Sequence, residues 1–126
     1  MTQKERFAQA LKEARREGVK VRQNVQCCCR GCITPDMIGL KDEEQPYAFT
    51  FGGQGDAYAW DEDTVVTRAS LNKAKNRGFG RTVFVEQVFF NWGNDSANVL
   101  VEAFERNGFD VEWDGSEYNC VVVNFE

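Results

Sequence analysis

Four of the five cysteines gather near residue 30, where their spacing could support metal or redox chemistry. Cys28, Cys29 and Cys32 follow a run of alternating apolar residues, and the Cys29-x-x-Cys32 pair encloses Gly31. Two thiols at this spacing can chelate zinc or form a redox-active disulfide. Small side chains packed in a turn would give the same pattern, because a reduced cysteine behaves as a small apolar residue.

A structural zinc site needs four ligands, and the chain contains no histidine to supply one. The fourth ligand would have to be Cys120, a neighbouring cysteine or a carboxylate, and the candidate metal ligands are Cys28, Cys29, Cys32 and Cys120. Only one Cys-x-x-Cys pair occurs, whereas zinc modules of this type usually carry two. The sequence therefore predicts no cofactor, with a bound zinc ion as the alternative.

The lack of histidine also restricts catalysis, because it removes the usual general base and every triad that depends on imidazole. The glycine-rich stretch at residues 52–56 lacks the Lys and Ser/Thr of a P-loop, so it predicts a turn. We therefore assign no catalytic or cofactor-binding residue, and we expect a protein that is not an enzyme.

Charge is unevenly distributed, since residues 68–81 carry five basic side chains and no acidic one, although the net charge is -5. These cations are the candidate partner-binding residues: Arg68, Lys73, Lys75, Arg77 and Arg81. One aromatic residue, Phe79, is not a stacking platform, and the acidic total disfavours broad nucleic-acid binding. The sequence predicts a protein partner. A solvated loop, or internal pairing with the acidic residues 110–117, are the alternatives.

Three stretches of the chain carry a family resemblance: residues 24–32 with the Cys-Cys-x-x-Cys motif, residues 47–56, and residues 108–115 with Val-Glu-Trp-Asp-Gly. Together they resemble an uncharacterised bacterial family, mainly actinobacterial, that has no established activity. Its members carry a histidine where this chain has Gly52, and they lack the basic segment. The resemblance implies a single domain with the cysteine cluster as a family feature. The closing helix and hairpin are also similar to ferredoxin-like regulatory proteins, including small ribonuclease inhibitors.

The first half of the chain predicts two helices and two strands. Thr2 and Glu5 fit a capping box, and apolar residues then recur at helical spacing as far as Gly18, so residues 2–17 predict a helix. Residues 19–27 alternate as a half-buried strand that leads into the cysteines. A short helix capped by Thr34 and a strand over residues 47–51 follow, and residues 57–60 fit either a strand or a helical turn.

The second half begins with an ambiguous stretch, residues 64–81, in which Ser70 could cap a helix through Asn76. Residues 83–92 carry apolar side chains at both odd and even positions, that is, on both faces of an extended chain. This pattern predicts a strand buried on both faces. Capping residues at 94–96 precede a helix over 96–107. Strands at 109–113 and 118–125, joined by a tight turn at Asp114-Gly115, close the chain.

These elements predict one α+β domain spanning residues 1–126, with a mainly antiparallel sheet and helices packed on one face. No apolar run is long enough to cross a membrane and the start has no apolar leader, so we expect a cytoplasmic protein with reduced thiols. The predicted function is non-enzymatic binding or regulation through protein–protein contacts, as in a small bacterial or phage inhibitor or adaptor. The alternative is a cysteine-centred protein with a structural zinc or a redox-active Cys-x-x-Cys.

Overall fold

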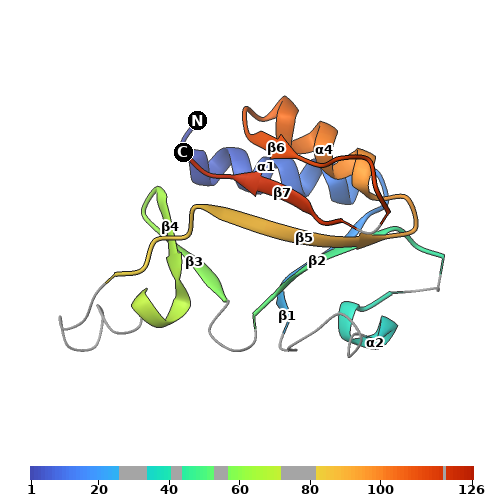
Figure 1. Cartoon of the computed structure of the whole chain (residues 1–126), viewed down its shortest axis with the longest axis horizontal. Coiled ribbons are helices and arrows are strands. Elements are labelled where there is room, and N and C mark those ends of the chain that lie inside the picture. The colour runs from blue at the N-terminus through green and yellow to red at the C-terminus, as the bar shows by residue number, and fades with distance from the viewer. Residues whose placement is uncertain (26–33, 41–43, 53–56, 72–81, 118) are drawn as a thin grey trace.

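The structure, a computed structural model, describes residues 1–25, 34–40, 44–52, 57–71, 82–117 and 119–126. A five-stranded sheet crosses the molecule, and two long helices lie together on one of its faces (Figure 1). In spatial order the strands are β1 (Lys20–Val25), β2 (Tyr47–Phe51), β5 (Gln87–Gly93), β7 (Val121–Asn124) and β6 (Asp110–Glu112). The helices are α1 (Gln3–Arg16) and α4 (Ala97–Arg106).

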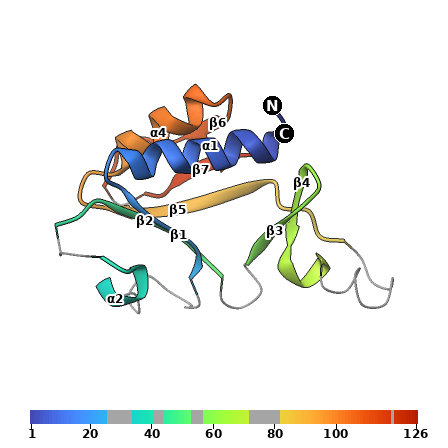
Figure 2. The same ribbon diagram turned by 180° about the vertical axis from the view of Figure 1, so that it is seen from behind.

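Two smaller elements complete the arrangement, and both are visible from behind as well (Figure 2). The hairpin of β3 (Tyr58–Asp61) and β4 (Thr64–Thr67) stands at the end of the sheet where the chain termini lie. The short helix α2 (Pro35–Ile38) lies on the side away from α1 and α4. β1 and β2 run parallel, whereas the other described strand pairs are antiparallel. The predicted α+β class with a mainly antiparallel sheet is confirmed.

Helix α1 begins and ends as its sequence predicts. The Thr2 hydroxyl accepts from the backbone N–H of Glu5 at 3.1 Å, and the Glu5 carboxylate accepts from the Thr2 backbone N–H in return. Gly18 follows the helix with φ +95°, a left-handed conformation that glycine adopts without steric cost. The buried apolar residues of α1 are Phe7, Ala10, Leu11 and Ala14.

Aromatic rings fill the space between the two long helices and the sheet. Phe7 lies at the centre of this cluster, with its ring centroid 5.3 Å from Phe104, 5.6 Å from Trp60 and 5.9 Å from Phe109. Phe90 of β5 is fully buried and lies 5.4 Å from Phe104. Tilted and edge-on ring pairs at these distances add to the free energy gained by apolar burial. The cluster is therefore the main core.

Strand β5 corrects one prediction. A strand over residues 83–92 that is buried on both faces is wrong, because β5 begins at Gln87 and Phe89 is 50% exposed on the face away from the helices. Phe90, on the helix-facing side, is fully buried. Two apolar residues before the strand are also exposed, Val83 at 52% and Phe84 at 64%. Periodicity cannot separate a core face from a solvent face when both carry apolar residues.

Helix α4 matches the prediction for residues 96–107 to within one residue at each end, but its predicted cap does not form. Ser96 occupies the N-cap position without a side-chain bond to the first turn. Its hydroxyl donates instead to the backbone oxygen of Tyr47 at 2.6 Å, and Ser96 is fully buried. A tertiary contact with β2 has therefore replaced the local cap.

The closing strands are shorter than predicted, since β6 and β7 span 110–112 and 121–124 in place of 109–113 and 118–125. A longer loop replaces the tight turn at Asp114-Gly115. One carboxylate oxygen of Asp114 accepts from the backbone N–H of Ser116 at 2.8 Å, and the other accepts from the Asn119 amide at 2.6 Å. These local bonds from an aspartate favour a loop over a two-residue hairpin.

The stretch after residue 57 forms the β3–β4 hairpin, so the strand alternative for residues 57–60 is the one that the structure has. Residues 68–71 are helical, and Thr67 caps them in place of Ser70, because its hydroxyl accepts from the Ser70 backbone N–H at 3.2 Å. Ser70 is buried, and its hydroxyl accepts from the backbone N–H of Val83 at 2.9 Å. The predicted continuation to Asn76 lies outside the described residues.

Candidate functional site

The clearest irregularity of the sheet is a gap along one side of β5. Toward β2, the ladder stops at the pair Phe49↔Asn91. Toward the hairpin, the chain before β5 is bridged to β4 at Val66↔Phe84. Between these two pairs, none of the described strands pairs with this side of the chain. We call residues 86–90 the open edge.

Neighbouring hydrogen bonds show which backbone groups of the open edge face the gap. The carbonyl of Glu86 accepts from the backbone N–H of Phe125, on the β7 side, at 2.8 Å. The backbone N–H of Val85 points the other way and donates to β4 at 2.8 Å. Successive residues of a strand direct their N–H and C=O groups to opposite sides. Gln87 and Phe89 therefore direct two donors and two acceptors into the gap.

A hollow of about 350 Å³ lies beside the open edge, between β2, β5 and the hairpin. Its apolar lining consists of Phe51, Val85, Val88 and Phe89. Its polar lining consists of Thr50, Tyr58, Thr67, Gln87 and Asn91. None of these described lining residues carries a formal charge at neutral pH, so this lining is electrically neutral as well as partly apolar.

Tyr58 forms the inner wall of the hollow, and a bulge at the end of β1 fixes its position. Asn24, at φ +56°, accepts from the backbone N–H of Tyr58 at 3.1 Å and donates to its carbonyl at 3.0 Å. The Tyr58 hydroxyl donates to the side-chain oxygen of Gln23. Burial raises the pKa of Tyr58 well above its ordinary value, so this phenol stays protonated and acts as a fixed hydrogen-bonding group.

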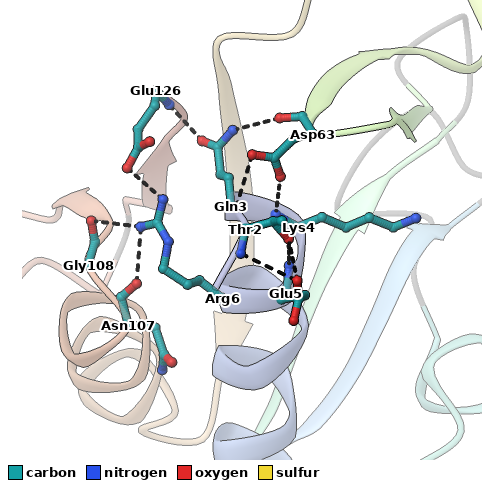
Figure 3. A network of polar contacts seen from close by, with 9 residues as sticks. All are labelled: Thr2, Gln3, Lys4, Glu5, Arg6, Asp63, Asn107, Gly108 and Glu126. Carbon is teal, nitrogen blue, oxygen red and sulfur yellow. Dashed lines mark hydrogen bonds and ion pairs between the residues drawn. The ribbon is translucent and has the colours of Figure 1, made fainter.

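A polar network holds the hairpin wall of the hollow in place (Figure 3). The carboxylate of Asp63, in the turn between β3 and β4, accepts from the backbone N–H groups of Gln3 at 3.2 Å and Lys4 at 2.8 Å. The buried Gln3 side chain donates to the Asp63 carbonyl at 3.1 Å and accepts from the backbone N–H of Glu126 at 2.7 Å. The hairpin, the first turn of α1 and the last residue are thus tied together.

Arg6 extends this network to α4. Its guanidinium pairs with the Glu126 carboxylate at 2.7 Å and donates to the carbonyls of Asn107 at 3.3 Å and Gly108 at 3.4 Å. It also lies 5.1 Å from the centre of the Phe109 ring. One side chain therefore connects both helices and the end of β7, as Figure 3 shows.

The predicted metal ligands are only partly described. Cys120 is half-buried, and its thiol donates to the Asn91 side-chain oxygen at 3.4 Å, next to the hollow. Cys120 directly precedes β7, which β2 and β5 separate from β1. Cys28, Cys29 and Cys32 lie outside the described residues. Within the described part of the chain, no group of three or more potential metal ligands occurs. The prediction that Cys28, Cys29, Cys32 and Cys120 lie close together therefore stays a prediction.

The basic segment is described only at its start. Arg68 is exposed, and its backbone N–H donates to the carbonyl of Ala57 at 2.8 Å as the helical turn begins. The other predicted partner-binding residues, Lys73, Lys75, Arg77 and Arg81, lie outside the described residues. Asp110 and Glu112 of the acidic hairpin are exposed, as alternation along the strand predicts.

Gly52 is the position at which the predicted family resemblance would place a histidine. Its backbone N–H donates to the carbonyl of Val25 at 2.8 Å, and a Cβ atom there would lie 2.7 Å from the backbone of Asn24. Since real Cβ atoms do not approach backbone this closely, no side chain fits here unless the end of β1 moves. A site built around that histidine is thus incompatible with this geometry.

Sequence reasoning missed the open edge, because it predicted that residues 83–92 are buried on both faces. The 50% exposure of Phe89 could not be read from a run that is apolar at odd and even positions alike. The gap itself depends on β2 and β4 flanking different parts of one neighbouring strand. Strand order of this kind cannot be obtained from local periodicity.

The comparisons with known proteins return no family model, no curated protein and no solved structure that matches this chain. The resemblance to the actinobacterial family therefore stays a prediction. No helix in the described part of the chain is long and apolar enough to cross a bilayer.

Proposed function

We propose that this protein is a non-enzymatic binding protein that acts through protein–protein contacts, as a small inhibitor or adaptor does. The observation that carries the proposal is the open edge beside an exposed apolar side chain. Unpaired strand edges are sites at which another chain can pair, and exposed aromatic residues are enriched where proteins bind. Large natural sheets otherwise cover or blunt such edges.

The chemistry of the hollow supports binding more than catalysis. Its described lining consists of apolar side chains, hydroxyls and amides, which supply apolar contacts and hydrogen bonds to a bound molecule. Thr50 accepts from the backbone N–H of Asn24 at 2.9 Å, and Thr67 is bonded to Ser70 at 2.7 Å. Both hydroxyls are thus engaged in holding the walls.

The basic segment supplies a second contribution to this proposal, because exposed Arg68 begins a run of five cations. A partner surface that carries acidic side chains would offset their mutual repulsion. Replacing Lys73, Lys75 and Arg77 with Ser tests this part. Unchanged stability with weaker, less salt-dependent partner binding supports the interface, whereas a loss of stability points to internal pairing with residues 110–117.

Capture of partners from cells of the source organism, with the tagged full chain, tests the proposed function directly. We expect a defined partner that survives washing and protects part of this protein from hydrogen–deuterium exchange. We include a cytoplasmic setting with reduced thiols in the proposal. If purified candidates neither bind nor protect any segment, the proposed function is wrong.

A cysteine-centred protein is the second candidate, favoured by the Cys29-x-x-Cys32 spacing. A zinc site would stabilise the fold, because metal binding energy is folding energy when the site exists only in the folded state. Elemental analysis and a chelator titration separate the two candidates. Stoichiometric zinc whose removal lowers the melting temperature supports the second, and metal-free protein with five titratable thiols supports packing.

A further inference from the structure

We propose that the gap in the sheet receives a short, extended, uncharged segment of a partner protein, which pairs with the open edge and places one large apolar side chain in the hollow. This inference rests on the proposed function and specifies its recognition chemistry. Three features of the described residues argue for it: backbone groups, length and charge.

The backbone groups favour a strand as the occupant. Gln87 and Phe89 present alternating N–H and C=O groups along the open edge, and an extended peptide presents the same alternation in return. Pairing would satisfy four backbone groups at once. Main-chain bonding of this kind gives affinity to strand addition, while pockets for alternate side chains give specificity.

The length of the gap limits the segment. Asn91 lies seven positions after Phe84, which corresponds to about 23 Å of extended chain. Pairing with β4 takes up one end of this stretch and pairing with β2 takes up the other. About five residues of a partner can therefore lie along the open edge. A long strand would collide with β2 and β4, because both lie on the same side of β5 as the gap.

The uncharged lining and the small volume of the hollow limit which side chain of the partner segment can enter it. A hollow of about 350 Å³ is at the small end of ligand pockets, and its apolar walls include Val88 and the exposed Phe89. A charged side chain that entered would lose hydration without meeting a counter-charge among the described lining residues. The hollow therefore favours an aromatic or large aliphatic residue from an uncharged segment.

A displayed library of random short peptides, selected on the whole protein, supplies the probe. We expect enriched sequences with β-branched residues around one large apolar residue and no charge in the central positions. Amide exchange gives an independent baseline. In the free protein, the amides of Gln87 and Phe89 should exchange faster than those of Val88 and Phe90, which face β7.

Two variants form a matched pair. Phe89→Lys places a charge in the wall of the hollow, whereas Phe84→Lys makes the same change at a more exposed phenylalanine outside that lining. We expect Phe89→Lys to weaken binding of a selected peptide by about tenfold or more, and Phe84→Lys to change it by less than about twofold. Melting temperatures verify that both variants are folded. Methylation of the peptide's central backbone nitrogen should weaken binding by a similar factor.

The inference is supported if the selected peptide also slows exchange at Gln87 and Phe89. It is overturned if no peptide is enriched, if binding is insensitive to Phe89→Lys and to backbone methylation, or if those two amides stay unprotected. Light scattering that shows a dimer with both amides protected would assign the gap to a second copy and also overturn it. A cellular partner that binds wild type and Phe89→Lys equally would leave the proposed function intact and remove this inference.

Discussion

Replacing Asp63 with Ala should destabilise the protein by about 1 kcal/mol, because this carboxylate completes the N-terminus of a helix that is 60 positions away in sequence. The structure shows two backbone N–H donors on one carboxylate, from Gln3 at 3.2 Å and Lys4 at 2.8 Å. Losing a capping acceptor costs about 0.5–2 kcal/mol, and losing an anion near a helix N-terminus costs about 0.3–1 kcal/mol. The capping box at Thr2 persists, so the lower part of the combined range applies.

Urea denaturation followed by circular dichroism measures this change, and a shift of about 4 °C in melting temperature should accompany it. Asp61→Ala is the matched control, since Asp61 is an exposed carboxylate of the same hairpin that lies outside the network of Figure 3. Asp63→Asn should lie between wild type and Asp63→Ala, because an amide oxygen still accepts one bond. Equal stabilities of Asp63→Ala and Asp61→Ala would refute this account of how the hairpin is held.

Three further perturbations follow from the core and from two titrating groups. Phe7→Ala should lower the free energy of unfolding by about 3–5 kcal/mol in chemical denaturation, because it leaves a cavity among the surrounding rings. Phe7→Leu should lower it clearly less. Equal losses for the two variants would contradict the packing described. The amide of Asn107, 2.7 Å from the Glu13 carboxylate, holds the pKa of Glu13 below its ordinary value. The resulting stability is present above the ordinary carboxyl pKa and is lost as pH falls through the lower folded-state value, so Glu13→Gln should flatten the acid limb of a stability–pH curve. Burial raises the pKa of Tyr58, so the free energy of unfolding should fall as pH rises above the ordinary tyrosine pKa of 10.0. The variant Tyr58→Phe should remove that loss. It should leave the tyrosinate absorbance of the folded protein unchanged, because Tyr58 stays protonated in the fold.

Local sequence determines α1 almost completely, and it determines other elements less well. The capping box at Thr2 and the left-handed Gly18 act within a few residues, so the helix they bound is readable without tertiary information. Ser96 has the residue type of a cap, yet its hydroxyl bonds to Tyr47 on β2. Local sequence does not show whether a serine hydroxyl will accept from a backbone N–H in the first turn of its helix or donate to a carbonyl elsewhere in the fold.

The candidate site was beyond sequence reasoning for a related reason. The continuous apolar run predicted a strand buried on both faces, but the exposure of Phe89 and the burial of Phe90 depend on which face the helices cover. The gap depends further on β2 and β4 flanking different parts of one strand. The cysteine and basic hypotheses concern residues mostly outside those described, and they stay predictions.

The network in Figure 3 also bears on the order in which the chain folds. It joins residues near positions 3, 63, 107 and 126, so it closes only after most of the chain has been placed. Contacts of such high sequence separation form only after a long loop has closed, and loop closure lowers the chain entropy before the contact contributes any stabilising free energy. Helix α1 can therefore form early around its own cap, while its attachment to the hairpin and the last residue follows late. Contacts that form after the transition state act mainly on the unfolding rate, so we expect a weakened network to speed unfolding more than it slows folding.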